Sequence, residues 1–414
     1  MRKYLKIFLL TGTAFISFML NAQDAQWRGP ERNGHYPDKG LLQEWPEEGP
    51  ELLTKIEGLN NGYSSPVFYN DVIYIPGRKD SATILTALKM DGTILWETPY
   101  GTAWMQSFQE TRNTPTIEND RIYISAGMGE VSCIDAKTGD LIWSVNTHEK
   151  FKGEFHRWGF AESLVITDDA VISSPVGNET VMVALDKETG DPIWKTESLG
   201  DVRSYVSPIL VDHNGKKMIL AVTINHALAI NPEDGKIFWK YELAENHPEG
   251  RNNNTNTPLY HNGEIFITRG YDAIAVMLKM SEDGNSVSLK WTSDVLDTHH
   301  GGVVLVDGYI YGSNWINNGN GNWICLDWDS GEVMYDEKWQ NKGSIIYADN
   351  RLYIYEEKRG HAGLVEPDPS GFKLKGSFRI TEGTGPHWAH PAIFDKKLFV
   401  RHGEVLMVYD VGRK

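Results

Sequence analysis

Two adjacent histidines, His299 and His300, stand before a glycine pair and a run of valines in the stretch DTHHGGVV (297–304). Neighbouring residues of a strand point to opposite faces, so both imidazoles cannot be packed into one core. A neutral imidazole can remove a proton, an imidazolium can donate one, and imidazole is a common metal ligand. These two histidines are therefore candidates for chemistry at the start of a strand.

Side chains that bind anions or stack on sugars recur in several other parts of the chain. Arginine, histidine, tryptophan and asparagine are unusually dense at 101–113, 148–160, 200–205, 245–256, 314–323 and 384–390. The chain as a whole is acidic, with 56 Asp and Glu against 40 Lys and Arg and a formal net charge of −16. Binding to nucleic acid through bulk charge is therefore excluded, and each cluster of cations needs a local explanation.

A repeated sequence unit predicts how these segments are positioned. Copies of one pattern occur at CIDAKTGDLIW (133–143), ALDKETGDPIW (184–194) and AINPEDGKIFW (229–239). The pattern reads as a strand, a tight turn with glycine and a second strand that ends in an aromatic residue. The closing tryptophan recurs about every 50 residues, the length of one four-stranded propeller blade, at Trp96, Trp143, Trp194, Trp239 and Trp291.

A second marker opens each unit. Five units begin with a small polar residue and a proline, at YSSPVF (63–68), RNTPTI (112–117), YVSPIL (205–210), TNTPLY (255–260) and WAHPAI (388–393). The set of eight is completed by FAESLV (160–165), HGGVVL (300–305) and KGSIIY (342–347). We therefore predict an all-β, eight-bladed propeller with docking tryptophans. A seven-bladed ring is the alternative, if the divergent seventh unit is not a true blade.

The ends of the chain complete this interpretation. Residues 50–414 are predicted to form a single propeller domain, in which PELLTKIEGL (50–59) supplies the outer strand that the last unit lacks. Residues 23–49 form a leader. Residues 1–22 have the basic start, apolar stretch and small final residue of a signal peptide cleaved near Ala22. We expect a monomer in the periplasm or outside the cell, with no membrane insertion.

The A-x-D-x-x-T-G-x-x-x-W pattern resembles the tryptophan-docking repeat of propellers of the pyrroloquinoline quinone (PQQ) type. The segment WRGPERNGHYPDKGLLQEWPEEGPELLTKIEG (27–58) resembles the leader of secreted bacterial members of that PQQ-like superfamily. The resemblance covers nearly all of the chain after residue 22 and implies the fold. It leaves the function open, because the superfamily includes quinone dehydrogenases, non-catalytic scaffold propellers and carbohydrate-processing proteins.

The first strand of each propeller blade lines the central channel, so the eight opening segments should meet at one mouth. Alignment of these segments places Tyr205, His300 and Trp388 at one position of the ring, and Glu162 and His390 two residues later on the same strand face. The predicted catalytic residues are His300, Tyr205, His390, Arg112 and Arg203. The predicted substrate-binding residues are Trp158, Trp388, His156, His299, Lys342, Asn254 and His387.

Each predicted residue type has a role in binding and cleaving an acidic sugar. Arg112 and Arg203 would clamp a carboxylate, because a guanidinium offers two parallel donors. His300 or Tyr205 would remove a proton, and His390 would protonate the leaving oxygen. His156 and Lys342 would act as supporting cations, and Trp158 and Trp388 as stacking platforms for the sugar rings.

The number of carboxylates at the mouth helps to decide which sugar-cleaving reaction is expected. Glu162 is the one carboxylate in the aligned positions, whereas glycoside hydrolysis usually needs two. Elimination next to a neutralised carboxylate needs only a base and an acid. We therefore predict a carbon–oxygen lyase or dehydratase that acts on uronate-containing or other anionic oligosaccharides, without a cofactor or metal.

Three alternatives stay open. The first is a non-catalytic sugar-binding or scaffold propeller. The second is a PQQ-dependent dehydrogenase with calcium, which is disfavoured because Cys133 and Cys325 fall on opposite sides of the ring and cannot pair. The third is a transition-metal site in the histidine cluster, although no H-x-x-x-H or local His-plus-carboxylate spacing occurs.

Overall fold

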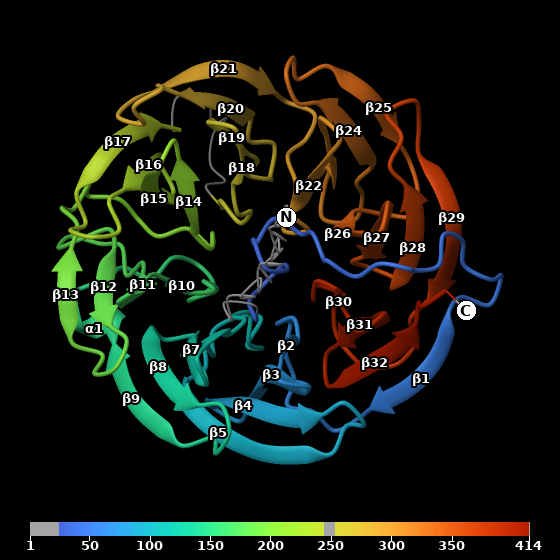
Figure 1. The fold of residues 1–414 in the computed structure, drawn as a ribbon, viewed down its shortest axis with the longest axis horizontal. Helices are drawn as coiled ribbons and strands as arrows, with labels where there is room; N and C mark the ends of the chain where they lie inside the picture. Colours follow the sequence, from blue (N-terminus) through green and yellow to red (C-terminus); the bar gives the residue numbers. More distant parts are fainter. Residues whose placement is uncertain (1–24, 244–252, 414) are drawn as a thin grey trace, which may run out of the picture.

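The computed structural model describes residues 25–243 and 253–413, which form eight four-stranded sheets around a central channel (Figure 1). The predicted eight-bladed propeller is confirmed. The seven-bladed alternative is wrong, because the divergent seventh unit forms a complete sheet. The predicted signal peptide, residues 1–22, and most of the loop 245–256 lie outside the described residues.

The first seven blades each run through their four strands in chain order. Blades 1 to 3 are β2 (Val67–Tyr69), β3 (Val72–Lys79), β4 (Ala82–Lys89) and β5 (Ile94–Thr102); β6 (Thr116–Glu118), β7 (Arg121–Ser125), β8 (Glu130–Asp135) and β9 (Leu141–Asn146); and β10 (Val165–Ile166), β11 (Ala170–Ser173), β12 (Val183–Asp186) and β13 (Pro192–Lys195). A short helix, α1 (Thr147–Lys150), follows β9.

The next three blades have the same order. Blades 4 to 6 are β14 (Ile209–His213), β15 (Lys216–Val222), β16 (His226–Ile230) and β17 (Ile237–Glu242); β18 (Leu259–His261), β19 (Glu264–Ile267), β20 (Ala275–Met280) and β21 (Val287–Ser293); and β22 (Val303–Val306), β23 (Tyr309–Ser313), β24 (Trp323–Asp327) and β25 (Val333–Glu337).

The last blade joins the two ends of the chain. Blade 7 is β26 (Gly343–Ala348), β27 (Arg351–Glu356), β28 (His361–Glu366) and β29 (Lys373–Arg379), and blade 8 is β30 (Ala392–Phe394), β31 (Lys397–His402), β32 (Val405–Asp410) and β1 (Glu51–Ile56). β1 pairs antiparallel with β32, from Glu51 opposite Asp410 to Ile56 opposite Leu406. This pairing closes the ring between its first and last blades.

The repeated tryptophan and glycine of the sequence unit pack against each other between neighbouring blades. The indole N–H of Trp143 donates to the carbonyl of Lys187 at 2.9 Å, and that of Trp194 donates to Pro232 at 3.0 Å. The turn glycine of the next blade lies under each ring: a Cβ on Gly190 would fall 2.7 Å from Trp143. Both motif positions therefore serve blade-to-blade packing.

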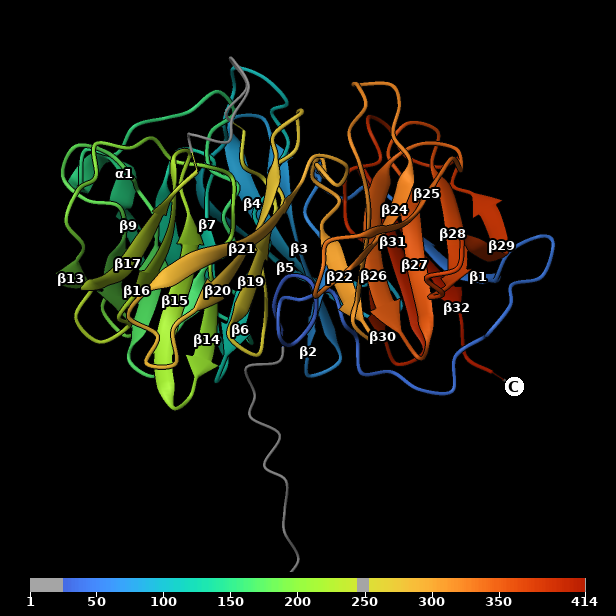
Figure 2. The ribbon, with the colours of Figure 1, turned by 90° about the horizontal axis from the view of Figure 1, so that it is seen from above.

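Two ends of the channel can be distinguished. We call the end at which the innermost strands begin the upper end, and the end at which they finish the lower end. The loops that join one blade to the next, and the loops between the second and third strands of a blade, lie at the upper end. Figure 2 shows these long loops above the blades and the blue leader running along the lower side.

The leader enters the channel from the lower end. Its backbone forms single bridges to two innermost strands, Ala25 with Ile117 and His35 with Tyr347. Arg28 and Arg32 are 3% and 4% exposed, and both have left-handed backbone angles, with φ of 62° and 56°. Residues other than glycine, asparagine and aspartate rarely adopt such φ values. Strong contacts therefore hold Arg28 and Arg32 in this conformation.

The two arginines donate to backbone carbonyls of the innermost segments. Arg28 donates to Val303 at 2.6 Å and to Gly301 at 3.2 Å, in blade 6. Arg32 donates to the carbonyl of Ser163 at 2.8 Å and to the hydroxyl of Thr116 at 2.9 Å. Burial lowers the pKa of each guanidinium to about 10, which still leaves it charged at neutral pH.

The glycine pair of the opening histidine motif is explained by close packing. A Cβ on Gly302, whose φ is +71°, would fall 1.8 Å from Arg28 Nη1. A Cβ on Gly301 would fall 1.9 Å from the carbonyl oxygen of Gly343 in the next blade. Glycine is therefore required here so that the leader and blade 7 can approach the start of β22.

Two remaining sequence features are structural. Cys133 and Cys325 are free, fully buried and packed in separate core clusters of blades 2 and 6. Within the described residues, no helix has the length and apolar character needed to cross a membrane.

Candidate functional site

A row of aromatic and imidazole rings crosses the upper end of the channel. Neighbouring ring centroids lie between 4.0 and 5.3 Å apart along the whole row. We call this set the ring row; in order, it consists of Phe108, Trp388, His300, His299, Tyr271 and Trp315. Its members come from loops of five different blades or blade junctions, so the row depends on closure of the ring.

The ends of the ring row are marked by exposed apolar side chains. Most exposed large hydrophobic residues of the described chain lie on the outermost strands of the blades. The exceptions are Met105, Phe108 and Ile316, which are 40%, 47% and 50% exposed and lie on upper-end loops. Exposed apolar groups beside partly buried rings are typical of a binding surface.

A buried charged cluster lies beneath the middle of the row. The carboxylate of Glu357, in the loop between β27 and β28, lies 2.9 Å from Lys342 Nζ, 3.0 Å from His299 Nδ1 and 3.4 Å from His300 Nε2. The Lys342 ammonium also donates to the carbonyl of Asn317 at 2.8 Å. Lys342 therefore serves Glu357 and a loop carbonyl, and it is not free to meet a substrate.

The protonation states of this cluster follow from its contacts. Burial alone would raise the pKa of Glu357, but the hydrogen bond from His299 and the nearby His300, His299 and Lys342 together lower it to about 2. Burial, with His299 adding to it, moves the pKa of His300 well below its ordinary value. Glu357 is thus ionised and His300 neutral at physiological pH.

A tyrosine–histidine pair lies on another side of the same mouth. The Tyr205 hydroxyl lies 2.6 Å from His156 Nδ1 and accepts the backbone N–H of Trp158 at 3.0 Å. Burial raises the pKa of Tyr205 to about 12 and lowers the pKa of His156. The pair is therefore neutral, with the tyrosine as donor to the imidazole.

The structure corrects the two predicted arginine clamps. Arg112 donates to the carbonyls of Trp158 at 2.8 Å and Ser107 at 3.2 Å, and also to that of Phe108. Arg203 is 2% exposed, lies 3.6 Å from Glu162 and stacks on the Phe160 ring. Arg112 thus holds the loop that presents Phe108. Arg203 is kept from the mouth by its burial, and its Nε and Nη1 have no hydrogen-bond partner in the described part of the chain.

Three further predicted residues are buried and hydrogen-bonded within the protein. His390 lies 3.2 Å from Arg28 and 2.9 Å from the His300 carbonyl, and burial lowers its pKa to about 3. Asn254 donates to the carbonyl of Thr223 at 2.6 Å. His387 bonds the Tyr355 hydroxyl and stacks on His402. Both nitrogens of His390 are engaged within the protein, so this geometry gives no support to its predicted role as general acid.

The structure thus sorts the predicted residues into groups. Trp388, His300, His299 and Lys342 come together around Glu357, and Tyr205, His156 and Trp158 form a second group next to Arg112. Sequence reasoning missed Glu357, Tyr271, Phe108 and Trp315. Glu357 and Tyr271 lie in loops between the second and third strands of their blades, and the alignment of opening segments did not include these loops.

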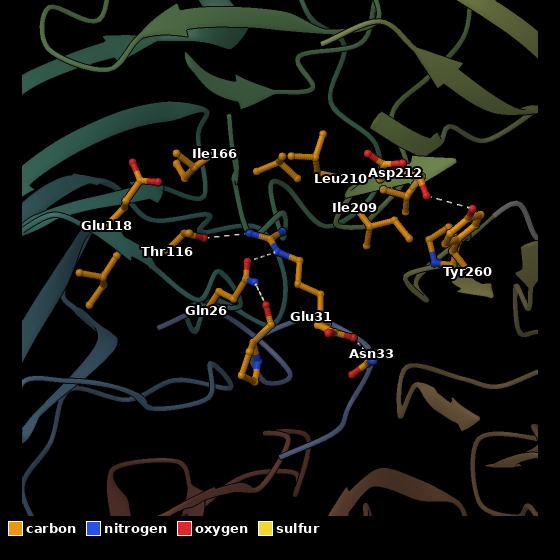
Figure 3. Close-up of a pocket in the computed structure, with 16 residues that line it drawn as sticks. Gln26, Glu31, Asn33, Thr116, Glu118, Ile166, Ile209, Leu210, Asp212 and Tyr260 are labelled. Atoms are coloured by element: carbon orange, nitrogen blue, oxygen red, sulfur yellow. Dashed lines mark hydrogen bonds between the residues drawn. The ribbon is translucent and has the colours of Figure 1, made fainter. Parts of the chain in front are cut away.

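The lower end of the channel has a cavity of its own, with a volume of about 310 Å³. Figure 3 shows it between leader residues, such as Gln26 and Glu31, and the lower ends of innermost strands, such as Ile166, Leu210 and Asp212. Arg32 forms part of its wall and donates to Thr116. None of the residues predicted from the sequence lines this cavity, so it is separate from the ring row.

Comparison with known proteins places the chain in a family. Residues 80–341 match the family described as outer membrane protein assembly factor BamB. The chain belongs to this PQQ-like β-propeller family. BamB from Yersinia pestis is 25% identical over 277 residues, which cover 64% of this chain and 66% of that protein. The chain spans about half to two thirds of the length of the curated relatives that it matches.

Solved structures share the fold at low sequence identity. BamB from Moraxella catarrhalis has a TM-score of 0.63 and 14% identity, covering 87% of this chain and 99% of that one. Quinohemoprotein alcohol dehydrogenase ADHIIG from Pseudomonas putida HK5 has a TM-score of 0.64 and 11% identity, covering 95% and 81%. At these identities the similarity shows the fold alone.

The quinone cofactor of the dehydrogenase branch does not fit the described upper end. PQQ is a flat polyanion, so its site needs cations that are free to meet carboxylates. Arg112 and Lys342 instead donate to a carbonyl and a carboxylate of the protein itself, and Arg203 is buried 3.6 Å from Glu162. The leader also fills the channel below the mouth with Arg28 and Arg32.

Proposed function

We propose that this propeller is a non-catalytic carbohydrate-binding protein whose ring row holds an oligosaccharide at the upper end of the channel. The observation that carries the proposal is a contrast within the mouth. Arg112, Lys342 and His390 are engaged inside the protein, while the Phe108 ring is 47% exposed and the neighbouring Trp388 ring is partly exposed.

The composition of the row suits sugars. Aromatic faces stack on the apolar faces of sugar rings, and amides bond the hydroxyl groups at their edges. Trp315, at one end of the row, is buried, and its loop presents the exposed Asn317, Asn318 and Asn320. The Trp315 indole N–H already donates to the Asn318 side chain at 3.3 Å.

The charge of the mouth favours a neutral oligosaccharide over the acidic one expected from the sequence. Of the three cations that pointed to a uronate, Arg112 and Lys342 donate to groups of the protein, and Arg203 is buried beside Glu162. We place the protein outside the cytoplasm, supported by the signal-like residues 1–22 and by relatives named as outer membrane assembly factors.

Binding to a panel of neutral and acidic oligosaccharides, measured by calorimetry, tests this proposal. We expect a neutral oligosaccharide to bind and Trp388→Ala to weaken it at least tenfold. Leu141→Ala is the matched control, because Leu141 is 49% exposed but lies on the outer strand β9. Failure of every sugar, together with binding of an unfolded polypeptide, contradicts the proposal and favours the assembly role named for the relatives.

The Tyr205–His156 pair favours a second candidate, the carbon–oxygen lyase expected from the sequence. A tyrosine hydroxyl bonded to a neutral imidazole can pass a proton in an elimination. Incubation with uronate-containing oligosaccharides, followed by mass spectrometry, tests it through loss of water or an unsaturated product. Turnover that disappears in Tyr205→Phe supports the lyase; no product from any substrate contradicts it.

A further inference from the structure

Three potential metal ligands converge beneath the ring row. His299 Nδ1, His300 Nε2 and one carboxylate oxygen of Glu357 all lie within 4.8 Å of one another. The histidines come from the loop before β22, and the glutamate comes from the loop after β27 in the next blade. This explains why no local spacing in the sequence indicated a metal site.

The surroundings of the three residues hold them in ligand form. Lys342 Nζ binds one carboxylate oxygen of Glu357 at 2.9 Å, and both histidine nitrogens face the other oxygen. The Tyr271 hydroxyl lies 2.8 Å from the second nitrogen of His299. Metal-bound histidines usually have such a partner on the remaining ring nitrogen, which fixes the ring orientation.

One ligand atom lacks a hydrogen bond. His300 Nε2 is a buried atom with no hydrogen-bond partner in the described part of the chain. A buried polar atom without a partner is unfavourable, and a bound cation would remove this cost. Its position facing Glu357 and beside His299 is the geometry that a shared ion would satisfy.

We propose that His299, His300 and Glu357 bind one divalent first-row transition-metal ion, such as Zn²⁺, at the upper mouth of the channel. Two nitrogens and one oxygen suit Zn²⁺ and similar ions, whereas Ca²⁺ and Mg²⁺ prefer oxygen ligands alone. A site with three protein ligands keeps a position open for water or for an oxygen of a bound ligand. The inference goes beyond carbohydrate binding and does not depend on it.

Calorimetric titration of chelator-treated protein with Zn²⁺ tests the site, on full-length mature protein without a histidine tag. We expect one equivalent to bind. His300→Ala should weaken binding at least about 100-fold, and Tyr271→Phe about tenfold. His226→Ala is the matched control: this histidine also lies near two carboxylates, 2.8 Å from Asp201 and 3.1 Å from Glu242, and its loss should change nothing.

The outcomes separate clearly. Stoichiometric Zn²⁺ binding that is lost in His300→Ala and kept in His226→Ala supports the site. The proposal is overturned by no binding, by equal binding in His300→Ala, or by Ca²⁺ binding as tightly as Zn²⁺. His300 is only partly buried, so its variant should fold, and circular dichroism checks this. Glu357→Gln gives a second test, with a crystal structure at the zinc absorption edge to locate the ion.

Discussion

The lower and upper ends of the channel bury charge in different ways. The leader, which enters from the lower end, carries Arg28 and Arg32, and these donate to backbone carbonyls at the starts of innermost strands in several blades. At the upper end, Glu357 pairs with Lys342 and with the side chains of His299 and His300. The lower charges meet a fixed backbone, whereas the upper charges meet side chains that can rearrange.

This difference shows that the partner of a charged residue says more about its role than the residue type does. Backbone carbonyls are obligatory acceptors, so an arginine that satisfies several of them acts as a cross-link. A carboxylate shared by two imidazoles, one of which lacks a hydrogen bond, can exchange its contacts for an ion or ligand. We therefore assign stability to the lower end and binding to the upper end.

The largest expected effect is on stability at the lower end. Arg32→Ala removes the arginine donor of the Ser163 carbonyl and one of the two donors of the Leu164 carbonyl in a buried channel, since the Thr116 hydroxyl also donates to Leu164. We expect the free energy of unfolding to fall by about 3 kcal/mol or more, as for other broken buried charge contacts. Chemical denaturation measures it, and a loss below about 1 kcal/mol contradicts the cross-linking role.

A smaller loss of stability is expected where the leader packs against the histidine motif. Gly302→Ala places a Cβ against Arg28 and strains a left-handed backbone, so we expect a loss of about 2 kcal/mol. Part of this loss should disappear when Arg28→Ala removes the clash, so the double variant should be less destabilised than the sum. Strict additivity of the two losses would show that Gly302 does not serve the leader.

The fold was predictable from the sequence because each blade repeats the same local solution. The Trp–Gly pairs, such as Trp143 with Gly190, are visible as sequence periodicity before any contact is known. The blade number followed from the eight opening segments, which precede the eight innermost strands. The repeats did not reveal that the leader binds inside the channel, because Arg28 and Arg32 occur once and have no counterpart to align.

The candidate site was predictable only in part. The opening segments correctly placed His300 and Trp388 near each other, since the strands that follow them are equivalent. The residue type does not tell whether an arginine is free to bind a ligand. A guanidinium such as that of Arg112 or Arg203 offers the same donors whether it faces a ligand or lies against the protein itself. Glu357 was missed because it lies in the loop between β27 and β28, and the alignment covered only the segments that open each blade.

At the upper end, we expect Phe108→Ala to weaken oligosaccharide binding about tenfold, which equals about 1.4 kcal/mol. Phe108 is 47% exposed and contacts Trp388, so its removal takes one platform from the ring row and little from the core. Ile193→Ala, at a site 49% exposed on β13, is the control. Unchanged affinity in Phe108→Ala would show that Phe108 does not bind the oligosaccharide and that only the more buried members of the ring row do.

The smallest effect should come from Tyr205→Phe. The change removes the hydroxyl that bonds His156 and accepts the N–H of Trp158, so we expect a stability loss of about 1 kcal/mol. Oligosaccharide affinity should stay within about twofold if the pair only supports the Trp158 loop. A large loss of affinity with unchanged stability would move this pair into the binding site.

The division between the two ends is tested most directly by one measurement, the rise in Tm caused by Zn²⁺ in Arg32→Ala and in His300→Ala. We expect a low starting Tm but a normal rise in Arg32→Ala, because its metal site is intact. We expect a normal starting Tm and no rise in His300→Ala. Loss of the Zn²⁺ response in both variants, or a collapse of starting stability in His300→Ala, would contradict this division.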